Sequence, residues 1–257
     1  MYDTPERASA RDAWWAGLRR HWRAAGLRGI PDRADMPEDL YALWLSPDLF
    51  FAQTCGYPLT HRLKDRVTLV ATPCYAADGC VGSTYCSVIV ARRDSDVHGL
   101  DDVAGKVAAI NGYDSQSGWN ALRHSLIGRG ALARIIKTGG HRRSMAAVRE
   151  GRADIAAIDC VAYANVQAVA PHETAPLHVI AKSASAPNLP YITRRDISAT
   201  ELQKLRDGLQ AAVTDPALAE ARSALLIAGV EIVLLQAYDH ILQMEREAER
   251  SAPLVGN

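Results

Sequence analysis

Short apolar runs alternate with segments of helical periodicity over most of this chain. Residues 106–110 form a compact apolar run between polar neighbours, which predicts a buried strand. Trp119, Leu122 and Leu126 then recur on one helix face, which predicts a helix over 118–127. The same reading predicts further strands at 49–52, 67–71, 85–91, 135–137, 153–158, 177–181 and 190–193, and helices at 37–45, 141–150, 161–169, 198–214, 216–224 and 238–250.

This order of elements indicates an α/β fold, whose default architecture is parallel sheets joined by helical crossovers. The N-terminal segment, residues 1–27, places Trp14, Leu18 and Trp22 among many charged residues. That pattern predicts an amphipathic helix and differs from the apolar centre of a secretory signal. We therefore expect either a cytoplasmic protein or a true start upstream of Met1.

Composition narrows the functional classes. The 257 residues carry a formal net charge of zero, with 48% hydrophobic and 23% charged residues, as in ordinary globular proteins. A neutral chain gives no indication of nucleic acid or an anionic membrane as the main partner. No apolar run approaches the roughly 18 residues that a membrane span needs. The sequence also indicates no metal and no cofactor.

The five cysteines are Cys55, Cys74, Cys80, Cys86 and Cys160, and they lack the paired CxxC spacing of a structural zinc site. An odd number allows at most two internal disulfides, and their pairing stays open. Cys160 is predicted at a helix N-terminus, where thiolates are stabilised. Packing explains it better than a role as a nucleophile.

Polar residues follow three of the predicted strands directly. Ser115, Gln116, Ser117 and Gly118 come after the strand at 106–110 and open a helix. Helix N-termini bind anions, and ligands gather at the carboxyl ends of strands. His141 follows 135–137, and Asp159 follows 153–158, so we expect one polar site. The alternatives are that the serines and Asp159 only cap helices and that His141 is a surface residue or a cap.

Several motifs in order give a resemblance to a known family. They are Met1-Tyr2-Asp3, Gln53-Thr54-Cys55-Gly56-Tyr57-Pro58, Thr72-Pro73-x-Tyr75, Gly79-Cys80-x-Gly82-x-x-Tyr85-x-Ser87, Ser115-x-Ser117-Gly118, Thr138-Gly139-Gly140-His141 and Gly151-x-Ala153-Asp154-Ile155-Ala156-x-Ile158-Asp159. Together they resemble the phosphate/phosphite/phosphonate-type solute-binding proteins of ABC importers, the PhnD-like group.

The resemblance implies a type II periplasmic-binding-protein fold, in which two α/β lobes close on a ligand at a hinge, with a helical C-terminal tail. We place the crossings near 90–93 and 177–182. One lobe would combine residues 1–90 with 183–257, and the other would be residues 91–182.

The resemblance also implies the roles of individual residues. Ser115, Gln116, Ser117 and Gly118 would hold the anionic head, and Tyr85 would donate its phenol from near the hinge. His141 would be a donor, and a cationic one if its pKa is raised. Asp159 would accept from a protonated ligand oxygen or a ligand amine. Tyr2 and Tyr57 would cap the ligand from the opposite lobe, although Tyr85 in a strand can also be a packing residue. The implied partners are a small phosphorus oxyanion and, for an exported monomer, an ABC permease.

Two features depart from the family pattern. Met1 lies inside the loop that normally follows the first strand, so we expect that strand to be missing, through a misplaced gene start or a truncated paralogue. The resemblance implies a periplasmic location, and a correct start codon would imply the cytoplasm. The second departure is Arg142 and Arg143 after His141. These two cations either favour a more acidic ligand or, as we expect, lie on a solvated helix face.

The same fold also serves enzymes of the menaquinone and thiamine pathways and effector-sensing domains, so an enzyme or a cytoplasmic sensor is the alternative function. An enzyme needs a nucleophile with a base, or metal ligands. The spacings show neither arrangement. We therefore expect a binding protein and not an enzyme.

Overall fold

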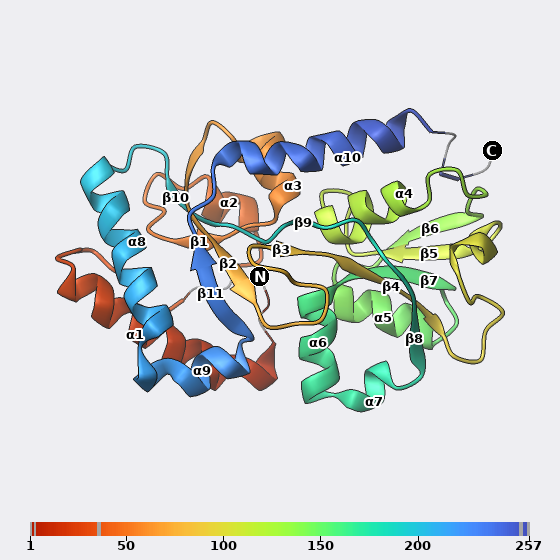
Figure 1. Ribbon diagram of the computed structural model, residues 1–257, viewed down its shortest axis with the longest axis horizontal. Coiled ribbons are helices and arrows are strands. Elements are labelled where there is room, and N and C mark those ends of the chain that lie inside the picture. The colour runs from red at the N-terminus through yellow and green to blue at the C-terminus, as the bar shows by residue number, and fades with distance from the viewer. Residues whose placement is uncertain (1, 3, 35–36, 252–253, 256–257) are drawn as a thin grey trace. The chain divides into compact units, whose positions relative to one another are not determined.

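Strands and helices alternate along the computed structural model, which describes residues 2, 4–34, 37–251 and 254–255. The chain divides into two units (Figure 1). Unit 1 consists of Met1–Ala76, Val81–Ser83 and Pro187–Ala237, and unit 2 of Ala77–Cys80, Thr84–Ala186 and Tyr238–Asn257. Both combine sheets with helices, in agreement with the α/β class expected from the sequence.

Unit 1 is built on a four-stranded sheet in the order β1–β10–β2–β11, with antiparallel neighbours throughout. Its strands are β1 (Ala52–Gln53), β2 (Val67–Tyr75), β10 (Tyr191–Arg194) and β11 (Ile227–Glu231). Its helical segments are η1 (Pro5–Arg7), α1 (Ala8–Ala24), α2 (Leu40–Trp44), α3 (Gly56–Pro58), η2 (Leu59–Leu63), α8 (Ala199–Thr214), η5 (Pro216–Leu218) and α9 (Ala219–Ala224), with η6 (Leu235–Tyr238) at its end.

Helix α1 is amphipathic, as its sequence predicts, and buries Trp14, Leu18 and Trp22. The indole Nε1 of Trp22 donates to the carbonyl oxygen of Leu205 in α8 at 3.0 Å. A Cβ atom on Gly208 would lie 2.4 Å from Cδ1 of Trp22, so the glycine lets α1 and α8 approach closely. Burying this tryptophan anchors the N-terminal helix on unit 1.

Unit 2 contains a five-stranded sheet in the order β6–β5–β7–β4–β8. Strand β5 is parallel to β6 and β7, and β4 runs antiparallel to both β7 and β8. The strands are β4 (Ser87–Arg92), β5 (Val107–Ile110), β6 (Arg134–Lys137), β7 (Ile155–Asp159) and β8 (Leu177–Lys182), and β3 (Thr84–Tyr85) pairs with β9 (Ala186–Pro187) in a separate ribbon. The expected all-parallel arrangement is therefore wrong for β4 and for the sheet of unit 1.

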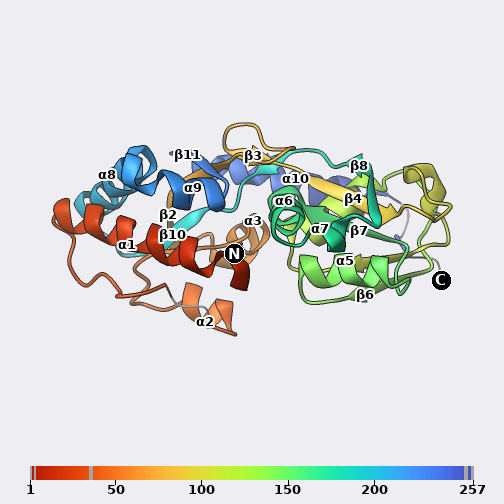
Figure 2. The same cartoon turned by 90° about the horizontal axis from the view of Figure 1, so that it is seen from below.

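The helical segments of unit 2 are η3 (Leu100–Val103), η4 (Gln116–Asn120, a π-helix), α4 (Ala121–Ser125), α5 (His141–Arg149), α6 (Cys160–Val169), α7 (Pro171–Thr174) and α10 (Asp239–Glu249). Strand β6 lies on one side of β5 in the sheet and β7 on the other, so the step from β5 to β6 and the step from β6 to β7 run in opposite directions across the sheet. Right-handed crossovers then place α4 and α5 on opposite faces. Figure 2 shows α5, α6 and α7 side by side. Ile89, Ile110, Leu122 and Ile155 are among the fully buried residues between these layers.

The last helix lies in a different unit from the one that the predicted lobes imply. The resemblance predicts residues 238–257 in the first lobe, whereas Tyr238–Asn257 belong to unit 2. Ile241 and Met244 of α10 are buried, and the carbonyl oxygen of Ile241 accepts from Nδ2 of Asn120 at 3.0 Å. These contacts with η4 hold α10 on unit 2.

Other differences concern boundaries. The chain passes between the units within 76–84, at 186–187 and at 237–238, instead of near 90–93 and 177–182. The strand predicted at 49–52 is only Ala52–Gln53, and β11 was not predicted at all, because its edge position depends on pairing with β2. No helix among the described residues is long and apolar enough to cross a membrane.

Candidate functional site

The turn after β5 carries the first group of predicted site residues. Ser115 has extended backbone angles, and its Oγ accepts from the N–H of Gly118 at 3.0 Å. It therefore caps η4, the alternative considered from the sequence, and the N–H of Gly118 points to this serine. Ser115 and Ser117 are both buried. The hydroxyl hydrogen of a capping serine remains a donor, so capping and ligand binding are compatible.

Ser117 and His141 meet at the adjacent carboxyl ends of β5 and β6. Oγ of Ser117 lies 2.9 Å from Nε2 of His141 and 3.5 Å from Oγ of Ser115. The parallel register pairs Ile110 with Lys137, which places the turns after both strands at one edge of the sheet. We call Ser115, Ser117 and His141 the polar cluster.

Burial controls the charge of His141. It lowers the pKa of this ring from 6.5 to about 4, and the backbone of Ala157 opposes part of the shift. Nδ1 of His141 is enclosed by protein and makes no hydrogen bond of good geometry among the described residues. The ring is therefore neutral at pH 7, unlike the cationic donor that a raised pKa would have produced.

Gly118 is required by close packing. A Cβ atom there would lie 1.8 Å from Oδ1 and 2.8 Å from Cγ of Asn111. The absence of a side chain thus lets the strand end at Asn111 pack against the first turn of the helix. The carbonyl oxygen of Asn111 also accepts from the N–H of Gly139, joining the turns after β5 and β6.

Gln116 contacts the C-terminal helix α10. Its Oε1 accepts from Nδ2 of Asn120 at 2.7 Å, and its Nε2 lies 3.3 Å from the sulfur of Met244 in α10. The side chain is buried. Its place in the sequence motif therefore reflects the contact of η4 with α10, and a ligand contact from Gln116 remains a prediction.

Asp159 is the last residue of β7 and caps α6. Its Oδ1 accepts from the N–H groups of Val161 and Ala162 at 2.8 and 3.2 Å. Ser87 pairs with Asp159 across β4 and β7, and the Ser87 hydroxyl donates to the carbonyl oxygen of Ser117 at 2.9 Å. Ser87 thus links the strand end that carries Asp159 to η4. The sequence motif contained Ser87, but nothing in the sequence indicated this role.

The three tyrosines occupy different places. Tyr85 is almost fully buried on β3, immediately before the strand that carries Ser87. Tyr2 and Tyr57 belong to unit 1: the Tyr2 ring meets the edge of Tyr75 at 5.1 Å, and Tyr57 stacks on His61 at 3.8 Å. Ligand contacts from Tyr2 and Tyr57 remain predictions.

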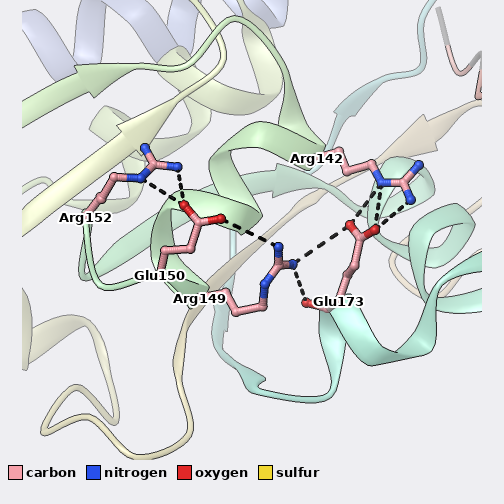
Figure 3. A network of polar contacts seen from close by, with 5 residues as sticks. All are labelled: Arg142, Arg149, Glu150, Arg152 and Glu173. Carbon is pink, nitrogen blue, oxygen red and sulfur yellow. Dashed lines mark hydrogen bonds and ion pairs between the residues drawn. The ribbon is translucent and has the colours of Figure 1, made fainter.

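Arg142 takes part in an ion-pair network along α5 and α7 (Figure 3). Its Nη2 and Nε lie 2.7 and 2.9 Å from the two carboxylate oxygens of Glu173. Arg143 instead donates from Nη2 to the carbonyl oxygen of Gly139 at 2.6 Å. These contacts give Arg142 and Arg143 partners within the protein, in agreement with the expectation that both lie on a helix surface.

Two cavities are lined by residues other than those of the polar cluster. One, of about 590 Å³ in unit 2, is lined by Arg134, Lys137, Arg143 and Arg152 together with Ile136, Thr138, Ala146 and Gly151. The other, of about 330 Å³ in unit 1, is mainly aromatic and aliphatic. In the described part of the chain, no group of three or more His, Cys, Asp and Glu side chains is arranged to hold a metal ion.

The sequence matches a family model described as the periplasmic substrate-binding protein of phosphonate ABC transporters, over residues 46–238. No curated protein sequence matches the chain significantly. The family match favours a substrate-binding protein of a transport family over the enzyme and sensor alternatives.

Solved structures show the same fold. PhnD1 from Prochlorococcus marinus, in complex with methylphosphonate, is 12% identical with a TM-score of 0.78, covering 96% of this chain and 95% of its own. A binding protein of an ABC phosphonate transporter from Pseudomonas aeruginosa is 16% identical with a TM-score of 0.77, covering 97% and 84%. XAC2383 from Xanthomonas citri, bound to ATP, is 17% identical with a TM-score of 0.69, covering 95% and 94%.

Proposed function

Because the chain belongs to the family of periplasmic substrate-binding proteins of phosphonate ABC transporters, we propose that its polar cluster binds the head of a small phosphorus oxyanion. The observation that carries this proposal is the 2.9 Å contact between Oγ of Ser117 and Nε2 of His141 at two adjacent strand ends. Such convergence at the carboxyl edge of an α/β sheet is where ligands bind in folds of this class.

The chemistry of the cluster suits an oxyanion. Ser115 and Ser117 offer hydroxyl donors, and buried donors bind charged oxygens more strongly than exposed donors do. His141 is neutral at pH 7, so it contributes through hydrogen bonding and carries no fixed positive charge. Binding by neutral donors favours recognition by geometry over recognition by charge alone.

Asp159 refines the ligand class. A carboxylate repels a fully ionised phosphonate, but it accepts a hydrogen bond from a protonated oxygen or an amine. The link from Asp159 through Ser87 to Ser117 keeps this carboxylate at the same end of the sheet. We therefore infer that the ligand is a phosphorus oxyanion that keeps one proton or carries an amino group. A monomeric, periplasmic receptor that delivers it to an ABC permease completes the proposal.

Calorimetric titration of the whole chain with methylphosphonate, 2-aminoethylphosphonate, phosphite, phosphate and sulfate tests this function. We expect saturable binding of at least one phosphorus oxyanion and none of sulfate. Ser117→Ala should weaken that binding by tenfold or more, about 1.4 kcal/mol, because one charge-assisted hydrogen bond is lost. Asp159→Asn keeps the oxygen that caps α6. This substitution should lower the affinity for a ligand that donates a hydrogen bond from a protonated oxygen or an amine.

Lys137→Gln is the matched control, because Lys137 lines the cavity of about 590 Å³ in unit 2, here called the basic cavity, and does not belong to the polar cluster. It should leave the affinity unchanged. If Lys137→Gln removes binding while Ser117→Ala does not, the anion binds in the basic cavity and the proposed site is wrong. Absence of binding by every phosphorus oxyanion to folded protein would reject the ligand class.

A further inference from the structure

Three of the five cysteines converge in unit 2, and the proposed function uses none of them. Sγ of Cys80 lies 3.5 Å from Sγ of Cys160. Cys86 directly precedes Ser87, and Cys160 directly follows Asp159, the residue that pairs with Ser87. The carbonyl oxygen of Cys86 accepts from the N–H of Cys160 at 3.1 Å. We call Cys80, Cys86 and Cys160 the thiol cluster. Cys86 and Cys160 are buried, whereas Cys80 is partly exposed.

A glycine holds the loop of Cys80 against the other two sulfurs. Gly79 has a φ of +99°, and a Cβ atom there would lie 2.6 Å from Sγ of Cys86 and 3.3 Å from Sγ of Cys160. The N–H of Cys80 donates to the carbonyl oxygen of Ala77 at 3.0 Å, which closes a tight turn. Asp78 pairs with Nζ of Lys182 at 2.7 Å. Backbone conformation and an ion pair together present Cys80 to Cys160.

We propose that Cys80 and Cys160 form a disulfide bond by exchange with an external disulfide. The thiolate of Cys80 attacks the external disulfide and releases one thiol, leaving a mixed disulfide on Cys80. Cys160 then loses its proton, and its thiolate attacks the Cys80 sulfur of the mixed disulfide, forms the internal bond and expels the second thiol. The two cysteines lose two protons and two electrons, which the external disulfide takes up to become two thiols.

The structure supports this order and this pair. Cys80 is the only member of the thiol cluster that is not buried, so a large oxidant reaches it first. A disulfide needs about 2 Å between sulfurs, so the two sulfur atoms, now 3.5 Å apart, have to approach by about 1.5 Å. Hydrogen bonds among the neighbouring thiols, together with burial, raise the pKa values of Cys86 and Cys160, that of Cys160 to about 12, so both are protonated thiols at neutral pH.

The family supplies a setting in which the reaction matters. Its members are periplasmic, and the periplasm is an oxidising compartment in which disulfides persist. The bond would tie the loop before β3 to the first residue of α6, directly after Asp159. It would therefore fix the end of β7, which carries this carboxylate, to the loop before β3, independently of which anion binds.

The test treats reduced, purified protein with oxidised glutathione, counts free thiols, and identifies linked peptides by mass spectrometry. We expect the wild-type chain to lose two of its five thiols and to yield a peptide that joins Cys80 to Cys160. The oxidised form should melt several degrees higher, and a reductant should reverse the change. Five free thiols after oxidation, or a link through another pair, would overturn the proposal.

Single variants define the route. Cys74→Ser is the matched control, since Cys74 lies in unit 1 beside Glu231, and it should oxidise like the wild type. Cys86→Ser should also still form the link. Cys80→Ser should keep all its remaining thiols, because the two buried sulfurs are shielded from the oxidant. Loss of thiols in Cys80→Ser would contradict the role of Cys80 as the point of entry.

Discussion

At the scale of single residues, His141 shows how burial changes a predicted role. The sequence places a titratable ring at a strand end, but only the fold determines its charge. Ser117 holds Nε2, protein encloses Nδ1, and burial lowers the pKa to about 4. A neutral ring that is hydrogen-bonded to a serine hydroxyl follows from this environment.

The pH dependence of stability should reveal the same residue. The unfolded chain binds a proton on His141 near pH 6.5, and the folded chain does so only near pH 4. The stability therefore falls as the pH drops from 6.5 towards 4, by roughly 2–3 kcal/mol at the lower end. Urea unfolding of the wild type and of His141→Gln at several pH values measures this change in the free energy of unfolding. The stability difference between the two should change over this range, and a constant difference from pH 7 to 4 would refute the lowered pKa.

At the scale of elements, α5 and α7 are joined by charges rather than by apolar contact alone. Glu173 binds Arg142 through both carboxylate oxygens, and Arg149 donates to its backbone carbonyl (Figure 3). The Arg142 hydrogen bonds lower the pKa of Glu173 and outweigh its burial. Arg142 is thus explained by a partner 31 residues later in the chain.

Glu173→Gln should destabilise the protein by about 1 kcal/mol at pH 7, since a two-point contact with arginine is lost. The contribution exists above the ordinary glutamate pKa of 4.5 and disappears as the pH falls through the lowered value. Thermal unfolding at pH 7 and pH 3 compares the two proteins. Glu150→Gln, at the more exposed end of the network, is the control and should change little. Equal effects of the two variants at pH 7 would contradict this view.

At the scale of the whole molecule, segments distant in the sequence build unit 2. Helix α10 contributes Ile241 and Met244 to the interior beside η4, and Glu245 pairs with Arg123 at 2.6 Å. The helix that carries Ser115 and Ser117 therefore depends on residues more than one hundred positions later. Helix α10 supports the proposed site through its contacts with Gln116 and Asn120 in η4.

Met244→Ala should test this dependence. The side chain is fully buried, so its removal should cost about 2–4 kcal/mol through lost contacts and a cavity. Because its sulfur contacts Gln116 in η4, anion affinity measured by calorimetry should also fall. Leu234→Ala, at a side chain that is 76% exposed, is the control and should change neither quantity. Unaltered affinity in Met244→Ala would show that η4 keeps its geometry without α10.

The sequence by itself determined the alternation of strands and helices, the amphipathic α1 and the polar residues at three strand ends. These features follow from local periodicity, capping chemistry and turn composition, which depend on near neighbours. The same local reading indicated that β5 and β6 end in candidate anion donors. It left both functions of Ser115, cap and ligand donor, open.

Tertiary structure decided the features that depend on distant partners. It set the direction of β4, the pairing of β11, the unit to which α10 belongs and the orientation of Gln116 towards Met244. It also made His141 neutral and brought Cys80 to Cys160. Strand direction, burial and side-chain proximity arise from contacts between segments far apart in the chain, and such contacts leave no periodic pattern in the sequence.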